Sequence, residues 1–217
     1  MSQDVFAVPY SDKPAEKLHD IRFVGVVRGC YSLSDRLDEN AACESVFACR
    51  TKSISTKRIE IDGPVRGEVG EAISLKLQEF EIIRGQVCAI TDRGMVLEID
   101  ASEEERTQIA GTIDWIKKNK FRSVKDLRDH KRILLSEPRS AIVLEDGRIV
   151  ECFVIDVSQS GAAVSANLCL ETGTPLALGS AVGVVARKLE VGFAVEFLEP
   201  LDMSKLDEIF AWSLDYI

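Results

Sequence analysis

Histidine and aromatic residues are scarce in this chain of 217 residues, which has two histidines and 6% aromatic residues. His19 lies in a polar N-terminal stretch and His130 lies among basic residues. The sequence shows no serine, histidine and aspartate in a hydrolase-like order, no glycine-rich loop of the kind that cradles phosphates, and no carboxylate pair with an obvious pocket. These absences lead us to expect a protein that is not an enzyme.

Long apolar runs and an excess of positive charge are also missing. No run approaches the roughly 18 residues of a membrane span, and no secretory signal precedes Pro9. Lysine and arginine total 27 against 36 aspartates and glutamates, for a net charge of −9. Because this charge repels phosphate groups, we expect no general binding to nucleic acids or to anionic membranes.

Cysteine occurs six times, without a Cys-x-x-Cys pair or a nearby histidine to share a metal. Most of the cysteines lie in apolar runs, where a free thiol behaves as a small hydrophobic residue. We therefore expect reduced core cysteines, no zinc site and no disulfide framework, in a cytoplasmic protein.

The chain divides by composition into four stretches. Residues 1–20 are polar and lack periodicity, which is typical of a flexible lead-in. Residues 21–100 contain short β-branched runs separated by polar or glycine turns, and this pattern predicts a barrel or a sandwich. Residues 101–120 contain the clearest helix. Residues 121–217 are again rich in strand patterns and end in a short amphipathic stretch that predicts a C-terminal helix.

The central helix carries its own start signal. Ser102 and Glu105 form a capping box, in which each side chain can bond the other residue's backbone amide. Ile109, Ile113 and Ile116 then recur at helical spacing and give one apolar stripe. Two interpretations stay open: a surface helix packed on one domain, or a connector whose second face contacts the other domain or another subunit.

Positive charge is concentrated between Lys117 and Arg139, where nine basic residues are opposed by three acidic ones. A basic cluster in an acidic chain is a place where a multiply charged anion would bind. The alternative is a solvated linker.

Two polar motifs begin and end the stretch from Arg128 to Gly161, which overlaps this basic cluster. Arg128 and Arg132 are four residues apart, and Asp156, Ser158 and Gly161 follow about two dozen residues later. Arginine offers a planar fork of donors that matches phosphate oxygens or a guanine edge, and a flat face for stacking. Aspartate and serine two apart on a strand point the same way, so both can contact one ligand edge. The chemistry indicated is capture of an anion and a purine.

An internal repeat relates the two strand-rich regions. Gly85–Ile99 matches Gly183–Phe197 at an offset of 98 (183 − 85 = 98). Upstream, Cys49–Ile61 matches Cys152–Val164 at an offset of 103 (152 − 49 = 103), so the first copy has five extra residues between the blocks. Two copies of one β domain explain the pattern most economically.

The first copy lacks the polar groups of the second. Under the same alignment, the residues at its five motif positions are, in order, Gly25, Gly29, Ser53, Ser55 and Arg58. Without paired arginines this copy cannot neutralise two phosphates. We expect it to have kept the barrel and lost the site.

The order Arg-x-x-x-Arg followed by Asp-x-Ser-x-x-Gly resembles the PilZ family of receptors for cyclic diguanylate (cyclic di-GMP). Gly192–Phe197 resembles the closing strand of that family, and the resemblance covers most of residues 21–200. It implies a mainly β fold with two PilZ-type six-stranded antiparallel β-barrels, a helix that joins them and a C-terminal helix. The first barrel would be a degenerate PilZ copy.

The resemblance also implies roles for the motif residues. Arg128 and Arg132 would hold phosphates and stack on or bond to guanine. Asp156 and Ser158 would contact the guanine edge or orient the arginines, and Gly161 would permit the turn. Two residues outside these roles are further candidate contacts: Arg139 and His130.

The leading hypothesis is therefore a non-enzymatic receptor. It would bind cyclic di-GMP, without a cofactor, at the C-terminal copy and pass the signal to a protein partner that the sequence does not identify. The alternative is a ligand-free PilZ-like structural protein that scaffolds a partner. A homodimer stays open under either hypothesis.

Overall fold

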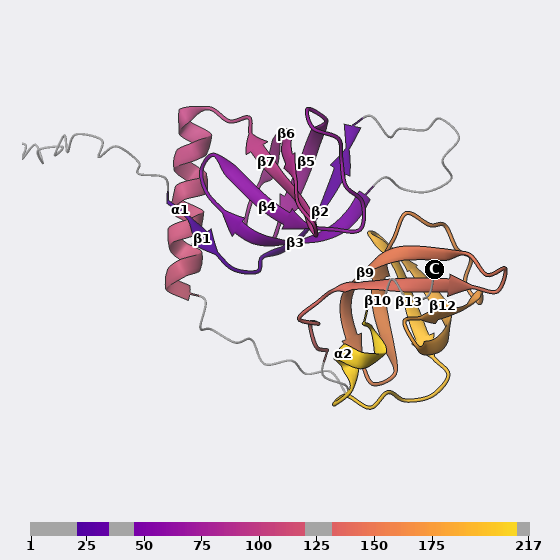
Figure 1. Cartoon of the computed structure of the whole chain (residues 1–217). Coiled ribbons are helices and arrows are strands. Elements are labelled where there is room, and N and C mark those ends of the chain that lie inside the picture. Colours follow the sequence, from indigo (N-terminus) through magenta and orange to yellow (C-terminus); the bar gives the residue numbers. More distant parts are fainter. Residues whose placement is uncertain (1–20, 35–45, 120–131, 212–217) are drawn as a thin grey trace, which may run out of the picture.

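The computed structural model describes residues 21–34, 46–119 and 132–211, which form two β-barrels with one long helix beside the first (Figure 1). The predicted class, a mainly β protein with two six-stranded antiparallel barrels, a helix between them and a C-terminal helix, is confirmed. The predicted lead-in, residues 1–20, lies outside the described residues. Among the described residues, no helix is long and apolar enough to cross a membrane.

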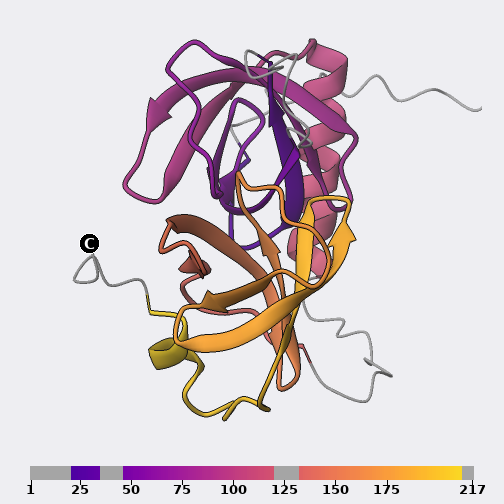
Figure 2. The ribbon, with the colours of Figure 1, turned by 90° about the vertical axis from the view of Figure 1, so that its right-hand side faces the viewer.

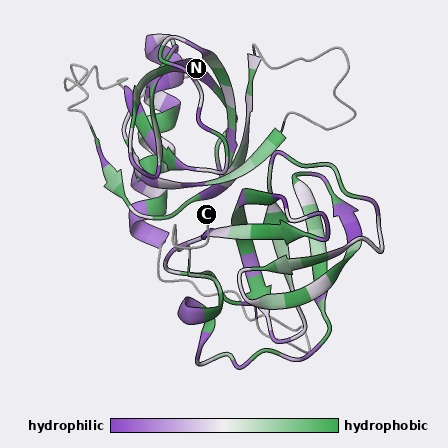
Figure 3. Cartoon of the chain, turned by 45° about the vertical axis from the view of Figure 1, so that its right-hand side comes forward, coloured by the Kyte–Doolittle hydropathy of each residue, from purple (hydrophilic) through white to green (hydrophobic). Residues whose placement is uncertain are grey.

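The first barrel closes through a six-strand ring, β3-β2-β5-β6-β7-β4, because β4 pairs back with β3, and β1 is added outside β3. Inward-facing side chains alternate with outward-facing ones along its strands, and Figure 3 shows the corresponding alternation of hydropathy. The strands are β1 (Phe23–Val24), β2 (Arg28–Leu33), β3 (Val46–Ile54), β4 (Arg58–Asp62), β5 (Ala72–Leu77), β6 (Ile82–Ile90) and β7 (Gly94–Ile99).

The second barrel is a closed ring in the order β10-β13-β12-β11-β8-β9. The helix α2 (Leu206–Ile209) lies against it, and the ring of Phe210 packs against Phe197 with centroids 6.3 Å apart. The predicted C-terminal helix is present as α2, which ends at Ile209, and residues 212–217 lie outside the described part. The strands are β8 (Arg139–Leu144), β9 (Ile149–Ser158), β10 (Gly161–Ser165), β11 (Pro175–Leu178), β12 (Ala181–Leu189) and β13 (Gly192–Phe197).

The helix α1 (Glu103–Asn119) packs along the first barrel, as both Figure 1 and Figure 2 show. The capping box is formed: the Ser102 amide donates to Glu105 Oε2 at 2.7 Å, and the Glu105 amide donates to Ser102 Oγ at 3.3 Å. The Ser102 amide and the Ser102 hydroxyl both donate to the Glu105 carboxylate, and these two bonds lower the pKa of that carboxyl. Ile109 and Ile113 are buried in the core of the first barrel, which favours the interpretation of a helix packed on one domain.

Gly111 lies in the middle of α1, with open space where a Cβ would be. Glycine in a helix loses more backbone entropy on folding than alanine does, so Gly111→Ala should stabilise the chain by about 0.5–1 kcal/mol. Urea unfolding checks this as a higher midpoint with an unchanged slope. Gly85→Ala is the contrasting variant, because its Cβ would lie 2.2 Å from the Glu98 carbonyl oxygen, and it should destabilise. A shift of both midpoints in the same direction would contradict this reading of the two glycines.

The internal repeat is visible in the strand pairing. The register of β6 and β7 shifts between Val87 and Ala89, and that of β12 and β13 shifts between Val185 and Arg187, again at an offset of 98 (185 − 87 = 98). The same irregularity recurs in the β3–β4 and β9–β10 pairs. The two barrels therefore share their bulges as well as their strand order.

The cysteines depart from the sequence-based expectation at one position. Cys169 is disulfide-bonded, so the expectation that all six cysteines are reduced is wrong there. Among the described residues, four others are free, and burial raises the thiol pKa of both Cys49 and Cys152. The free cysteines are Cys30, Cys49, Cys88 and Cys152.

Candidate ligand-binding site

The candidate site begins at the end of β9. Asp156 and Ser158 flank Val157, whose side chain is buried, so the two polar side chains point to the outer face of the barrel. Ser158 faces Gly161 across the turn into β10, and its hydroxyl donates to the Gly161 carbonyl oxygen at 3.2 Å. The turn thus fixes the serine beside the aspartate.

Arg132 is held beside Asp156 because the next residue, Ile133, forms an antiparallel β-bridge with Val157. The Ile133 amide donates to the Val157 carbonyl at 2.8 Å, and the Val157 amide donates to the Ile133 carbonyl at 3.0 Å. The residue before the bridge, Arg132, places its Nη1 atom 3.3 Å from a carboxylate oxygen of Asp156. The structure therefore brings together one residue from each sequence motif.

The Arg132–Asp156 ion pair is partly open to solvent. The arginine side chain is 40% exposed and the aspartate side chain is 14% exposed. A pair in this setting contributes roughly 0–1 kcal/mol to folding, so stability alone gives little reason for it. A guanidinium held by one carboxylate and still exposed can present further N–H groups to an incoming anion.

Gly161 is needed for a different reason from the one that the resemblance implied. Its φ is not positive, so the turn does not demand glycine. A Cβ at this position would instead lie 2.4 Å from the carbonyl oxygen of Val195 on β13. The close approach of the two strands explains the missing side chain.

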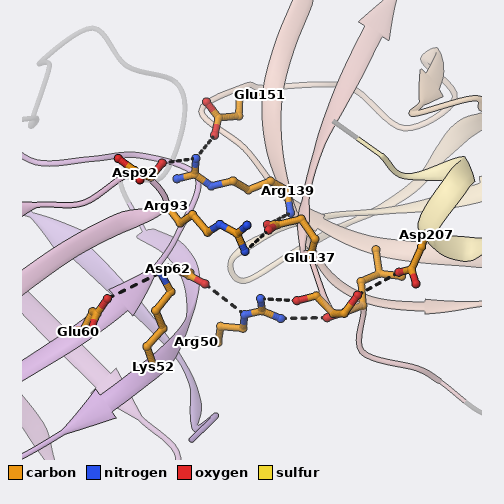
Figure 4. A network of polar contacts seen from close by, with 12 residues as sticks. Arg50, Lys52, Glu60, Asp62, Asp92, Arg93, Glu137, Arg139, Glu151 and Asp207 are labelled. Carbon is orange, nitrogen blue, oxygen red and sulfur yellow. Dashed lines mark hydrogen bonds and ion pairs between the residues drawn. The ribbon is translucent and has the colours of Figure 1, made fainter. Parts of the chain in front are cut away.

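Three other candidates are placed apart from this cluster or cannot be placed. Arg128 and His130 lie outside the described residues. Arg139 faces the first barrel: its Nη1 atom donates to the Asp92 carbonyl at 3.1 Å and lies 3.2 Å from Glu151 Oε1 (Figure 4).

The first barrel retains a counterpart of Arg132 that the sequence alignment missed. Phe23 pairs with Ile54 in the first barrel as Ile133 pairs with Val157 in the second, and Ile54 and Val157 are related by the repeat offset (157 − 54 = 103). The counterpart of Arg132 is therefore Arg22.

The alignment that placed Gly25 and Gly29 at the arginine positions is wrong for this reason. The alignment kept the offset of 103 for residues on both sides of the connection between β2 and β3. That connection is longer than the corresponding β8–β9 turn, so the offset differs before it. Gly29 in fact pairs with Cys49, as Ser140 pairs with Cys152. The recurrence of arginine before an apolar residue, Arg22-Phe23 and Arg132-Ile133, was the available signal.

The two copies differ in the group that faces this arginine. Arg22 Nη2 donates to the Ser53 hydroxyl at 3.1 Å, where the second barrel has the carboxylate of Asp156. The neighbouring turn is conserved in geometry, because Ser55 donates to the Arg58 carbonyl at 3.0 Å as Ser158 does to that of Gly161. The first copy therefore has no carboxylate at the position of Asp156, and it has the bulky basic Arg58 at the position of Gly161.

The first barrel also contacts the chain just after Arg132 (Figure 4). Arg50 Nη1 donates to the Leu135 carbonyl at 2.9 Å, and Nη2 donates to the Ser136 carbonyl at 2.8 Å. Arg93 Nη1 lies 2.6 Å from Glu137 Oε2. These contacts join the two barrels at the segment that carries the candidate site.

A cavity of about 510 Å³ lies between the barrels beside these contacts. Its lining includes Val24 and Arg50 from the first barrel and Leu134 and Phe153 from the second. This volume is in the range of small-molecule sites, although Arg132 and Asp156 lie outside the lining. Within the described ranges, no group of three or more histidine, cysteine, aspartate or glutamate side chains is placed to hold a metal ion.

Comparison with known proteins identifies the second barrel. Residues 126–214 match the family model described as PilZ domain, so this part of the chain is a PilZ domain, and the two barrels fit a tandem PilZ arrangement. No curated protein matches the sequence.

The solved structures that are similar to this chain include three at low identity. The inhibitor of motility MotI/DgrA of Bacillus subtilis has 11% identity and a TM-score of 0.27, over 87% of this chain and 94% of that one. YcgR of Escherichia coli in complex with c-di-GMP has 10% identity and a TM-score of 0.25, over 82% and 76%. The K. pneumonia MrkH–c-di-GMP complex has 11% identity and a TM-score of 0.26, over 85% and 82%.

Proposed function

We propose that this protein is a non-enzymatic receptor for cyclic di-GMP, which binds at the PilZ domain formed by the second barrel. The observation that carries the proposal is the meeting of Arg132 with Asp156 at the end of β9, inside the segment that matches the PilZ family. A positive fork, an acceptor carboxylate and a hydroxyl on one open face are the groups that a guanine nucleotide requires.

Each residue has a distinct task in this proposal. Arg132 bonds a phosphate or the guanine acceptor edge with its N–H fork and offers its flat face for stacking. Asp156 orients that guanidinium and can accept from the guanine N–H groups, and Ser158 fixes the turn. Arg128, in the same motif as Arg132, supplies the second guanidinium.

The proposal also covers how the signal is passed on and where in the cell the protein acts. Binding alters the surface that the protein presents to a protein partner, which carries the signal onward. A cytoplasmic location is part of the proposal, because a nucleotide messenger is sensed in the compartment that contains it. The alternative, a ligand-free scaffold, gains support from the Arg132–Asp156 pair, since each charge already has a partner within the chain.

Competition for labelled cyclic di-GMP in equilibrium dialysis tests the function. We expect the intact chain to retain the label and unlabelled cyclic di-GMP to displace it. Cyclic di-AMP should compete at least tenfold less well, because adenine lacks the N–H pair that a carboxylate accepts and the O6 that an arginine donates to. Failure to retain label at protein concentrations far above micromolar would favour the scaffold.

Arg132→Lys should weaken cyclic di-GMP binding by a moderate factor, between that of the parent and that of the alanine variant. Lysine keeps the charge but loses the planar fork and the stacking face. The same dialysis measures the change, with Arg148→Lys, an exposed arginine at the β8–β9 turn, as the control. Binding by Arg132→Lys equal to that of the parent would reduce the role of Arg132 to a point charge.

A further inference from the structure

We propose that Arg50 of the first barrel is a positioning residue for the dinucleotide site of the second barrel. It holds the backbone of the segment that carries Arg132, so the first copy contributes to binding without touching the ligand. This inference rests on the proposed function above.

The first observation is that the Arg50 side chain makes two hydrogen bonds to the backbone of the second barrel. Two guanidinium nitrogens of Arg50 donate to the consecutive carbonyls of Leu135 and Ser136, at 2.9 and 2.8 Å. Two bonds from one planar group fix both the position and the orientation of this peptide stretch. Leu135 lies three residues after Arg132, so the contact acts close to the binding side chain.

The second observation is that Arg50 is itself held. Its Nε atom lies 3.5 Å from Oδ2 of Asp62, the residue opposite it on β4, and the Asp62 side chain is 3% exposed. Lys52 Nζ lies 3.1 Å from the other oxygen, Oδ1. A buried carboxylate requires such counter-charges, which keeps Arg50 in one orientation before any ligand arrives.

The third observation is that the segment is anchored from the other side as well. Ile133 is bridged to Val157 on β9, and the Leu135 side chain is buried in the core of the second barrel. Residues 132–136 are therefore clamped between β9 and Arg50. Removing Arg50 leaves two carbonyls without these donors and lets the segment move, which changes the aim of the Arg132 guanidinium toward Asp156.

Arg93 provides a matched comparison. It also joins the two barrels, through Glu137, but its side chain is 58% exposed and it bonds a side chain instead of the backbone of the segment. A variant at Arg93 loosens the contact between the barrels and leaves the two carbonyl bonds of Arg50 in place. The amide of Ala48, which donates to Ser165 Oγ at 3.0 Å, still joins the barrels in both variants.

The experiment compares Arg50→Ala and Arg93→Ala with the parent, all as intact chains, by stopped-flow binding of cyclic di-GMP. We expect Arg50→Ala to weaken affinity about three- to tenfold, mainly through faster dissociation, because tuning within one site acts mostly on the off-rate. Arg93→Ala should stay within about twofold. In the ligand-free chain, hydrogen exchange of the Ile133 amide should be faster in Arg50→Ala than in Arg93→Ala.

The inference can fail in two distinguishable ways. If the parent binds and both variants bind alike, or if the Ile133 amide exchanges more rapidly with no loss of affinity, Arg50 is only an interface residue and the inference fails alone. If the parent does not bind, the proposed function fails and takes the inference with it. If Arg50→Ala does not fold, Asp62→Asn replaces it: this change removes the charge that orients Arg50, and it should give a smaller loss in the same direction.

Discussion

Arg132→Ala is expected to weaken the binding of cyclic di-GMP at least tenfold. Each charge-assisted hydrogen bond to a phosphate is worth on the order of 1.5–3 kcal/mol, and about 1.4 kcal/mol corresponds to a factor of ten. Truncation removes up to two such bonds and leaves Asp156, 3.3 Å away, as an unopposed negative charge beside the phosphate. Because micromolar affinity amounts to about 8 kcal/mol in total, the loss is a large fraction of the whole. Titration of the variant against the parent measures it.

The matched control is Arg22→Ala. Arg22 occupies the corresponding position of the first barrel, and its partner there is the Ser53 hydroxyl. We expect its removal to leave affinity within about twofold, since substitutions away from a site generally cost less than roughly 0.5 kcal/mol. A folded Arg132→Ala variant that binds like the parent would refute the site. An equal loss in Arg22→Ala would show that the first copy had kept a binding site.

Arg106, on the helix α1, cannot serve as a second neutral control beside Arg22. Its guanidinium donates to the carbonyls of Thr56, Ile99 and Ala101 and so fastens the helix to the first barrel. Its replacement would change the stability of the first barrel. The residues around Arg106 in the sequence do not indicate these bonds, because the acceptors are backbone atoms.

Gly161→Ala is expected to destabilise the second barrel and to weaken ligand binding together. The new Cβ would lie 2.4 Å from the Val195 carbonyl oxygen, a backbone atom that can move only if β10 and β13 separate. Overpacking of this kind costs about 1–3 kcal/mol. Because Gly161 faces Ser158 across the turn, the same shift displaces the polar end of β9.

Thermal unfolding and calorimetric titration together measure the effect of Gly161→Ala. The melting temperature should fall by several degrees, whereas Gly111→Ala, with open space around its Cβ, should raise it. An unchanged melting temperature for Gly161→Ala would show that the two strands adjust freely. The structural reason given for this glycine would then be wrong.

Local signals predicted most of the fold. The capping box at Ser102 placed the start of the helix. An Asp-Gly pair between apolar runs is a local hairpin signal, and Asp146-Gly147 does lie at the turn between β8 and β9, where Gly147 has a φ of 82°. The repeat predicted that both barrels share one strand order, and the common bulges of their strands agree with that. Such features depend on neighbouring residues, which is why one sequence suffices for them.

The features that the sequence did not predict depend on contacts between residues far apart in the chain. Arg50 is one basic residue in a strand, and nothing in the sequence around it indicates that it reaches two carbonyls 85 and 86 residues away. The correspondence of Arg22 with Arg132 was missed because the β2–β3 connection of the first copy is longer than the β8–β9 turn of the second. The position of Arg139 in the second barrel suggested a ligand contact, but the approach of the first barrel engages it with the Asp92 carbonyl.

The most direct test of the central claim is isothermal titration calorimetry of cyclic di-GMP into the intact chain. The proposal predicts a saturable heat with a dissociation constant near the micromolar range, equivalent to about −8 kcal/mol, and abolition or strong weakening of that heat in Arg132→Ala. A folded parent chain that gives no saturable heat with cyclic di-GMP would contradict it.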